Sequence, residues 1–324
     1  MKPLRFAALG DSLTEGIGDP VGGGRWRGWA ALLAAGLAPA HVPVEFRNFA
    51  ASGAQTGDVL DRQLPAALAF APDVVSVVVG VNDTLRHTFD IHAVAARLDT
   101  VYGAFGAQGA VLLTACLPDP GAMLGLPGAL ARPLARRQRA VNSVVHVLSE
   151  RHGAVHLHAS EGDRVADRAL WSADRLHPGE RGHRLLAARF HALLTASGVA
   201  HGPAPGTEPD GPAPTRSAAW WWLATAGTGW IARRCTDLLP QLVALAADEI
   251  RHGLRGTGAR LDLRASAGVA AALSATSGGA MRVASDLASD GGPIRVASDG
   301  GALRIAPEWR APRPSVREQP EGVQ

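Results

Sequence analysis

The chain has 324 residues, of which 47% are hydrophobic and 19% charged, so it is long enough for one full-sized globular domain and a smaller addition. The formal net charge is only +3 and no dense basic run is interleaved with aromatic residues, which argues against nucleic-acid binding. Cys116 and Cys235 stand too far apart in the sequence to indicate a disulfide scaffold or a zinc site.

The N-terminus runs through Met1, Lys2 and Pro3 directly into a strand-like segment. This leaves no room for the apolar core of a signal peptide, so we expect a cytoplasmic protein.

Five short apolar runs have the length of buried strands. The run over 74–79 is rich in β-branched residues and does not alternate with polar ones, which is typical of a strand covered on both faces. The five runs cover residues 4–9, 42–49, 74–79, 110–117 and 154–157. Helix-like stretches lie between and after them, over residues 29–37, 56–70, 91–105, 134–152 and 182–196. This alternation predicts an α/β fold, with an open parallel sheet and helices on both of its faces.

Candidate functional residues follow the ends of these strands. Ser12 follows the first strand, Gly53 the second and Asn82 the third, and Cys116 closes the fourth. Ligands of open parallel sheets bind beyond the carboxyl ends of the strands. We therefore expect these residues to lie at one edge of the sheet.

The composition changes after residue 200. We predict a Pro/Gly-rich linker over 201–216, a Trp-rich helical appendage over 217–254, and a low-complexity tail over 255–324 without stable structure. The uncharged segment around Trp220 and Trp230 is too short to span a membrane. We expect it to pack against the main domain or a second subunit, with contact to a membrane surface as the alternative.

Acyl transfer needs a nucleophile, a base, a group that orients the base, and donors for the developing oxyanion. Ser12 begins a glycine-flanked turn and is the candidate nucleophile. Asp174 and His177 are three residues apart, so the carboxylate can hold Nδ1–H of the imidazole and leave Nε2 facing Ser12. Gly53 can offer a backbone N–H and Asn82 a side-chain amide to the oxyanion. Taken singly, each of these segments also fits an ordinary turn or a helix cap.

The order of these segments along the chain, and their positions after successive strands, are more informative than any one segment. Four blocks occur in sequence: Gly-Asp-Ser-Leu at 10–13, Asn-Phe-Ala-Ala-Ser-Gly at 48–53, Gly-Val-Asn-Asp at 80–83, and Asp-x-x-His-Pro at 174–178. Over roughly residues 4–197 the chain resembles the SGNH (GDSL-type) hydrolase superfamily.

The resemblance implies a three-layer α/β/α sandwich around five parallel strands, of flavodoxin-like type, over residues 1–200. It implies Ser12 as nucleophile, His177 as general base and Asp174 as its orienting partner. The Ser12 N–H, the Gly53 N–H and the Asn82 side chain would form the oxyanion hole. Thr14 stands where the nucleophile elbow of classical lipases has glycine, so that fold is disfavoured.

No metal or organic cofactor is expected. His156 and His158 alternate on the fifth strand and point the same way, but no cysteine or carboxylate companion stands at a suitable spacing for a metal site, so we interpret them as packing residues. Cys116 lacks a supporting His–Cys arrangement in the sequence and is disfavoured as a nucleophile. The apolar segment 117–127 is expected to line an acyl pocket.

These patterns predict a serine hydrolase of carboxylic esters or thioesters with a small-molecule or lipid-like substrate. One alternative is an acyltransferase or deacetylase acting on a sugar or a cell-wall-like acceptor. Another is an interaction scaffold that uses the Trp-rich segment. The natural substrate, the acyl-chain length and the oligomeric state stay open.

Overall fold

A computed structural model describes residues 2–160, 167–210 and 243–289, with side chains described up to residue 276. The chain divides into two units, Met1–Ala280 and Met281–Gln324. The first unit contains the predicted α/β domain. Of the Trp-rich segment predicted over 217–254, residues 217–242 lie outside the described residues.

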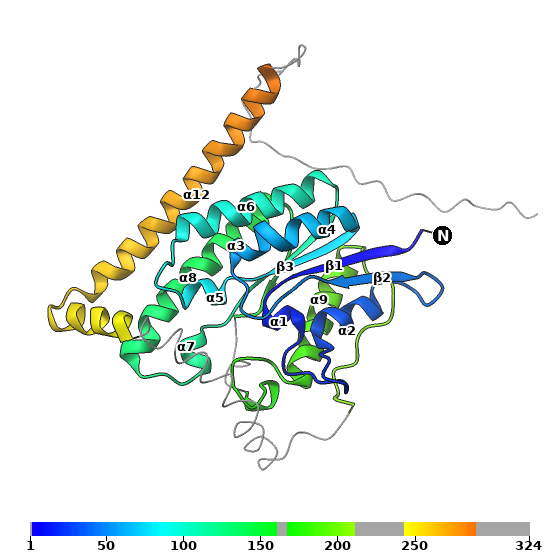
Figure 1. Ribbon diagram of the computed structural model, residues 1–324, viewed down its shortest axis with the longest axis horizontal. Coiled ribbons are helices and arrows are strands. Elements are labelled where there is room, and N and C mark those ends of the chain that lie inside the picture. Colours follow the sequence, from blue (N-terminus) through cyan, green and yellow to red (C-terminus); the bar gives the residue numbers. More distant parts are fainter. Residues whose placement is uncertain (1, 161–166, 211–242, 290–324) are drawn as a thin grey trace, which may run out of the picture. The chain divides into compact units, whose positions relative to one another are not determined.

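Five parallel strands form one sheet, in the order β2-β1-β3-β4-β5 (Figure 1). Their bounds are β1 (Leu4–Gly10), β2 (Val44–Asn48), β3 (Val74–Val78), β4 (Val111–Cys116) and β5 (Val155–His158). Every predicted strand is confirmed, and the strand order is that of flavodoxin-like folds. The order reverses between β1 and β3, which are neighbours in the sheet. Ligands bind at such a switch point, beyond the carboxyl ends of the strands.

Helices cover both faces of the sheet, which confirms the three-layer sandwich. On one face lie α3 (Thr56–Asp58), the π-helical turn η1 (Val59–Gln63), α4 (Leu64–Phe70), α6 (Ile91–Ala107) and α8 (Gly128–Arg151). On the other face lie α2 (Gly28–Gly36) and α9 (Glu180–Ala196). Short helices near the carboxyl ends of the strands are α1 (Ser12–Glu15), α5 (Val81–Thr84), α7 (Pro120–Met123) and the 3₁₀ turn η3 (Arg168–Leu170).

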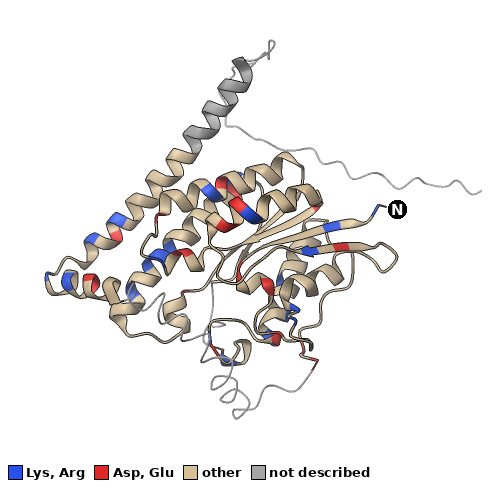
Figure 2. Ribbon diagram, in the orientation of Figure 1, with Lys and Arg blue, Asp and Glu red and all other residues tan. Residues whose placement is uncertain are grey.

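Two apolar layers hold the sandwich together. Alternate residues of β1 point to opposite faces, so Leu9 packs in the layer that contains α4, α6 and α8, whereas Phe6 packs in the layer of α2 and α9. In the second layer Trp29 stacks on Phe190 with ring centroids 4.8 Å apart. Strands β3, β4 and β5 carry no charged Asp, Glu, Lys or Arg side chain, and Figure 2 shows the charges mainly on the helices and on the β1–β2 side of the sheet.

The first part of the predicted linker is held against the domain. The backbone N–H of His201 donates to Leu37 at the end of α2 (3.0 Å), and Nε2 of His191 contacts the carbonyl oxygen of Gly202 (3.2 Å). At residue 210, Arg27 and Arg184 both form ion pairs with the Asp210 carboxylate. Residues 201–210 therefore form part of the surface of the α/β domain.

The tail differs from the prediction over residues 258–289, where the chain forms helix α12 (Gly258–Ser289). The expected lack of structure is wrong for this stretch, because it is rich in alanine, a strong helix former, and has apolar residues to bury. Ala272 is buried in the same layer as α6 and α8, and Thr276 accepts a hydrogen bond from Arg151 (2.8 Å). Residues 290–324 lie outside the described residues.

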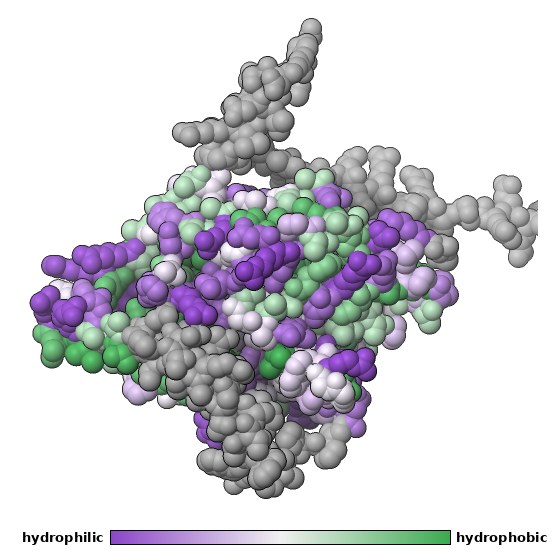
Figure 3. Space-filling model, in the orientation of Figure 1, coloured by the Kyte–Doolittle hydropathy of each residue, from purple (hydrophilic) through white to green (hydrophobic). Residues whose placement is uncertain are grey.

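A separate helix over residues 243–254 precedes α12. Glu249 on this helix pairs with Arg136 of α8 (3.0 Å). Val243, Ile250 and Leu254 are exposed, and Figure 3 shows apolar surface gathered over this helix. Within the described residues, no helix is long and apolar enough to cross a membrane.

Candidate active site

Ser12 lies at the switch point of the sheet, at the start of α1 directly after β1. Gly10 ends β1 with a positive φ of 148°, and a Cβ at this position would overlap the carbonyl oxygen of Val78 on β3. Only glycine therefore allows the chain to turn here while β1 stays paired with β3. Asp11 caps α1 by accepting a hydrogen bond from the N–H of Leu13 (3.0 Å), as expected of a turn-supporting residue.

Gln63 holds the end of β1 from the side of η1. Its Oε1 accepts from the N–H of Gly10 (2.8 Å), and its Nε2 donates to the carbonyl oxygen of the same residue (2.9 Å). Both backbone groups of Gly10 are buried, so the paired contact satisfies them where the strand pairing ends. Gln63 thereby fixes the position of the residue two places before Ser12.

His177 bridges Ser12 and Asp174. Its Nε2 lies 2.7 Å from Ser12 Oγ, and its Nδ1 lies 2.6 Å from Asp174 Oδ2. The turn that carries both residues is closed by a hydrogen bond from the N–H of Ser172 to the carbonyl oxygen of His177 (2.8 Å). The structure therefore brings Ser12 together with His177, which is 165 positions away in the sequence, and with Asp174.

Asp174 is a carboxylate held by several donors. Its Oδ1 accepts from Ser172 Oγ (2.6 Å) and from the N–H groups of Leu176 (2.9 Å) and His177 (3.0 Å). Burial alone would raise the pKa of Asp174, but the hydrogen bonds and the charge of His177 outweigh it and lower the pKa to about 2. An ionised carboxylate only accepts, so the proton of the imidazole is on Nδ1 and Nε2 accepts from the Ser12 hydroxyl.

Asn82 lies in α5, directly beyond β3. Its Nδ2 donates to the carbonyl oxygen of Ala54 (3.1 Å) and to Oδ2 of Asp11 (3.3 Å). Next to it, Asp83 is buried and accepts from both the N–H (3.0 Å) and the hydroxyl (2.6 Å) of Thr56. These contacts join the loops after β2 and β3 beside Ser12.

Gly53 follows β2 with a φ of 81°. Asn82 and Ser12 line the same cavity, but Gly53 is not among the described residues around it and lines a neighbouring hollow instead. The structure thus places two of the three expected oxyanion-hole residues together. The role of Gly53 stays a prediction.

Asp11 is buried beside these residues. Burial and, to a smaller extent, repulsion by the second carboxylate Asp83 raise its pKa to about 6, although the hydrogen bond from Leu13 and the charge of His177 act in the opposite direction. The region around Ser12 therefore contains a carboxyl group that titrates close to neutral pH.

The cavity above Ser12 and His177 encloses about 120 Å³ and is mostly apolar. Segment 117–127 contributes Leu117, Pro118 and Met123, so its expected position at a pocket is confirmed. The remaining apolar lining comes from other elements at this edge: Leu13, Val81, Leu85, Ala159, Leu170, Trp171, Leu176, Pro178, Leu185 and Leu186.

Three positioning residues escaped the sequence analysis. Ser172 supports Asp174, Gln63 supports Gly10, and His183 bridges two segments by accepting from the N–H of Trp29 (3.1 Å) and donating to Ile17 (3.0 Å). Ser172 stands two residues before Asp174, which is the spacing of a local side-chain contact, and could have been found. The other two depend on contacts across the fold.

Comparison with known proteins defines the class. The sequence profile of the GDSL-like lipase/acylhydrolase family matches residues 8–185, which is more than half of the chain. A search of curated proteins finds no match.

Solved structures similar to this chain include three hydrolases. An acetylxylan esterase from Geobacillus stearothermophilus is 20% identical, with 59% of this chain and 94% of that chain covered and a TM-score of 0.49. An alpha/beta hydrolase enzyme from the metagenome of Lake Arreo is 21% identical, with 61% and 97% covered and a TM-score of 0.48. A psychrotrophic esterase from Pseudoalteromonas sp. is 22% identical, with 60% and 97% covered and a TM-score of 0.46.

The five-stranded parallel sheet, with helices on both faces and Ser12 at its switch point, defines a protein of the α/β class. More specifically, the chain belongs to the GDSL-like lipase/acylhydrolase family and acts on ester bonds.

Proposed function

We propose that this enzyme hydrolyses carboxylic esters or thioesters through an acyl-enzyme on Ser12. The observation that carries the proposal is the continuous line of short hydrogen bonds from Ser12 Oγ through His177 to Asp174, at the base of an apolar cavity. A hydroxyl, a base and an oriented carboxylate in this geometry are what nucleophilic acyl transfer requires.

In the first half-reaction, Ser12 Oγ attacks the acyl carbon and its proton passes to Nε2 of His177. The imidazolium is stabilised by the Asp174 carboxylate and then gives the proton to the leaving alkoxide or thiolate. In the second half-reaction, His177 takes a proton from water, the hydroxide attacks the acyl-enzyme, and Ser12 recovers its proton as the acid leaves. No proton or electron is gained or lost over the cycle apart from ionisation of the product acid.

The oxyanion would be stabilised by the N–H of Ser12, the N–H of Gly53 and the amide of Asn82. Both amide hydrogens of Asn82 have acceptors in this structure, so the side chain must exchange Ala54 or Asp11 for the substrate oxygen. Such an exchange replaces one hydrogen bond by a stronger one to a developing negative charge.

The cavity supports an apolar acyl group as the part of the substrate bound next to Ser12. Leucine side chains from α9, segment 117–127 and the loop before His177 surround it, and burial of an acyl methylene is worth about 0.8 kcal/mol. We therefore expect kcat/KM for p-nitrophenyl esters to rise from acetate to butyrate by a factor of several for each added methylene that is buried.

The test is labelling with a fluorophosphonate probe, followed by mass spectrometry of the labelled peptide. Ser12 should carry the adduct, and the adduct should disappear in Ser12→Ala and become much slower to form in His177→Ala. Ser52→Ala is the matched control, because Ser52 is an exposed serine on the loop after β2. Labelling of folded protein at another serine, or unchanged labelling in His177→Ala, contradicts the proposal. Addition of an alcohol or a sugar acceptor during turnover separates transfer from hydrolysis by the products formed.

A further inference from the structure

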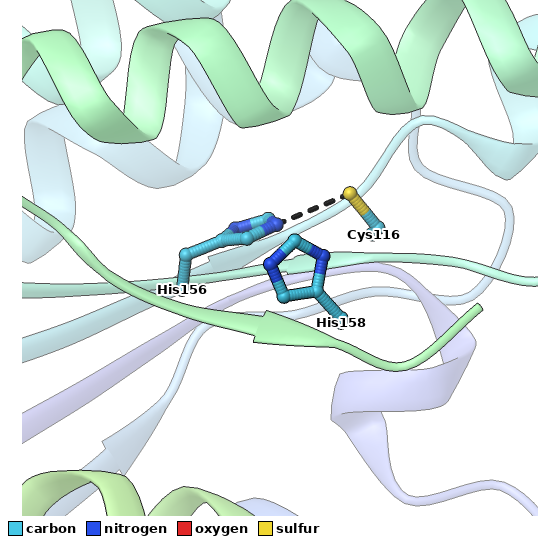
Figure 4. Close-up of side chains that lie close together, drawn as sticks. All are labelled: Cys116, His156 and His158. Atoms are coloured by element: carbon cyan, nitrogen blue, oxygen red, sulfur yellow. Dashed lines mark hydrogen bonds between the residues drawn. The ribbon is translucent and has the colours of Figure 1, made fainter. Parts of the chain in front are cut away.

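A cysteine and two histidines meet at the carboxyl ends of β4 and β5, on the face of the sheet that α8 covers (Figure 4). Cys116 is the last residue of β4 and stands opposite His158 in the strand register, and Thr114 stands opposite His156. Residues two apart on a strand share a face, so both histidines point toward the side of the sheet where Cys116 lies. The sequence separates Cys116 from His156 by 40 positions.

The potential ligand atoms are close together. One atom from each of Cys116, His156 and His158 lies within 4.8 Å of the others, and Sγ of Cys116 is 3.1 Å from Nε2 of His156. In a tetrahedral zinc site with Zn–S near 2.3 Å and Zn–N near 2.0–2.1 Å, sulfur and nitrogen ligands are about 3.5 Å apart. The three side chains therefore need only small adjustments to share one ion.

A chain of hydrogen bonds fixes the tautomer of His156. Ser149 donates to the carbonyl oxygen of Val145 (2.5 Å), so Thr114 must donate to Ser149 (2.7 Å). The Thr114 oxygen then accepts from Nδ1–H of His156 (2.9 Å). The lone pair of Nε2 is left pointing at the cysteine sulfur, which is the arrangement of a metal-ligating histidine with its supporting partner.

We propose that Cys116, His156 and His158 form a binding site for a transition-metal ion, with Zn²⁺ as the best match to one sulfur and two imidazole ligands. Thiolate and imidazole ligands favour Zn²⁺ and other borderline or soft ions over Mg²⁺ and Ca²⁺, which prefer oxygen. Binding converts the Cys116 thiol to a thiolate, and the proton is released to the solvent. No electron is transferred.

His146 of α8 is the candidate for a fourth ligand. Its ring centroid lies 5.3 Å from that of His156 and 5.2 Å from that of His158. It is one helical turn beyond Asn142, whose carbonyl oxygen contacts Cys116 Sγ (3.6 Å). A side-chain rotation of His146, or a water molecule, would complete a tetrahedral set.

This site is independent of the proposed ester chemistry. Cys116 and both histidines are absent from the described lining of the cavity above Ser12, but the next residues along each strand, Leu117 and Ala159, belong to it. An ion bound between Cys116 and the β5 histidines would therefore tie together the two strand ends from which the cavity lining continues. Its main effect is expected on stability.

The test uses the full chain, which is first stripped of metal ions with a chelator. Zn²⁺ alone is then added as the probe, and a chromophoric chelator that competes for it reports the amount bound. About one Zn²⁺ per chain should bind, and the thermal midpoint should rise with zinc concentration. Cys116→Ser, His156→Ala and His158→Ala should each weaken binding by about 100-fold or more, and Thr114→Val, which removes only the partner of Nδ1, by about 10- to 100-fold. His41→Ala and Cys235→Ser are the matched controls and should leave binding unchanged.

Co²⁺ gives a second readout that does not depend on activity. The cobalt-loaded protein should show a thiolate-to-cobalt charge-transfer band in the near ultraviolet, which persists in Cys235→Ser and is lost in Cys116→Ser. Circular dichroism of each variant checks that the fold is intact. The proposal is overturned if zinc does not bind at 100 µM, if folded Cys116→Ser or His156→Ala binds like the wild type, or if the cobalt band follows Cys235.

Discussion

Replacement of Asp174 by asparagine separates the structural role of this carboxylate from its role in orienting His177. The hydrogen bonds to Asp174 lower its pKa from an ordinary value of 3.8 to about 2. At 1.36 kcal/mol for each pKa unit, a lowering from 3.8 to about 2 corresponds to about 2 kcal/mol of stability. The side chain is 6% exposed, so solvent screening removes little of this contribution.

The sign follows from the depressed pKa. The contribution is fully present above pH 3.8, where the unfolded carboxyl group is also ionised, and it is lost as the pH falls toward 2. Urea denaturation should therefore show Asp174→Asn to be about 2 kcal/mol less stable than the wild type at pH 6, with the difference shrinking as the pH approaches 2. A difference that stays constant with pH would contradict the pKa argument.

The same variant should lose ester hydrolysis for a different reason. Asparagine can donate to Nδ1 of His177, which favours the tautomer with the proton on Nε2, and that nitrogen can no longer accept the Ser12 proton. A fall in kcat on the order of 10⁴ is expected at pH 7, measured with a p-nitrophenyl ester. A fall of less than about 10-fold in folded protein would refute the assignment of Asp174 as the orienting group.

Three further variants test other parts of the site. Asn82→Ala should lower kcat by about 10²–10³ with little change in thermal midpoint, because it removes one oxyanion donor; an unchanged kcat would exclude this role. In the wild type, ionisation of buried Asp11 lowers the free energy of unfolding by about 3 kcal/mol as the pH rises through about 6. Asp11→Asn should remove this pH dependence, which urea titrations between pH 4 and 8 would measure. Gly10→Ala should destabilise the domain by more than about 3 kcal/mol and abolish labelling of Ser12. Gly22→Ala is the control, because a Cβ at this position meets no atom within 4 Å, and it should cost only the strain of its positive φ, about 1 kcal/mol.

The central strands β1, β3 and β4 could be predicted from sequence because they are mostly buried and read as apolar runs, whereas the edge strands β2 and β5 are only partly buried and were found from their length and their place between helices. The stretch 56–70 shows the limit of this reasoning. Its apolar spacing predicts one helix, but the structure contains a π-helical turn over Val59–Gln63 between α3 and α4. Pro65 cannot donate a backbone hydrogen bond, and the wider turn before it brings Gln63 to face Gly10. Periodicity alone does not reveal such a change of phase.

Within the active site, local contacts were predictable and distant ones were not. Asp174 and His177 meet because they are three positions apart in a tight turn, and the end of β1 brings Ser12 to the same edge. The acceptors of Asn82 are a different matter. Ala54 and Asp11 come from the loops after β2 and β1, and their distances from Asn82 depend on how three loops pack together. The sequence therefore predicts which residues gather here but not which hydrogen bonds they form before substrate binds.

The cluster of Cys116, His156 and His158 could likewise be predicted only in part, because it depends on how strands pair in the sheet. The alternation of His156 and His158 indicates that they share a face, but their partner is found only when β5 is placed beside β4 and the register sets Cys116 opposite His158. In a flavodoxin-like order β4 and β5 are neighbours, so a resemblance strong enough to fix the fold also places these two strands side by side. The register that sets Cys116 opposite His158 is given by the structure. Alternate residues of the same strand ends then serve two purposes. Cys116 and His158 face α8, and the residues that follow them, Leu117 and Ala159, line the cavity above Ser12.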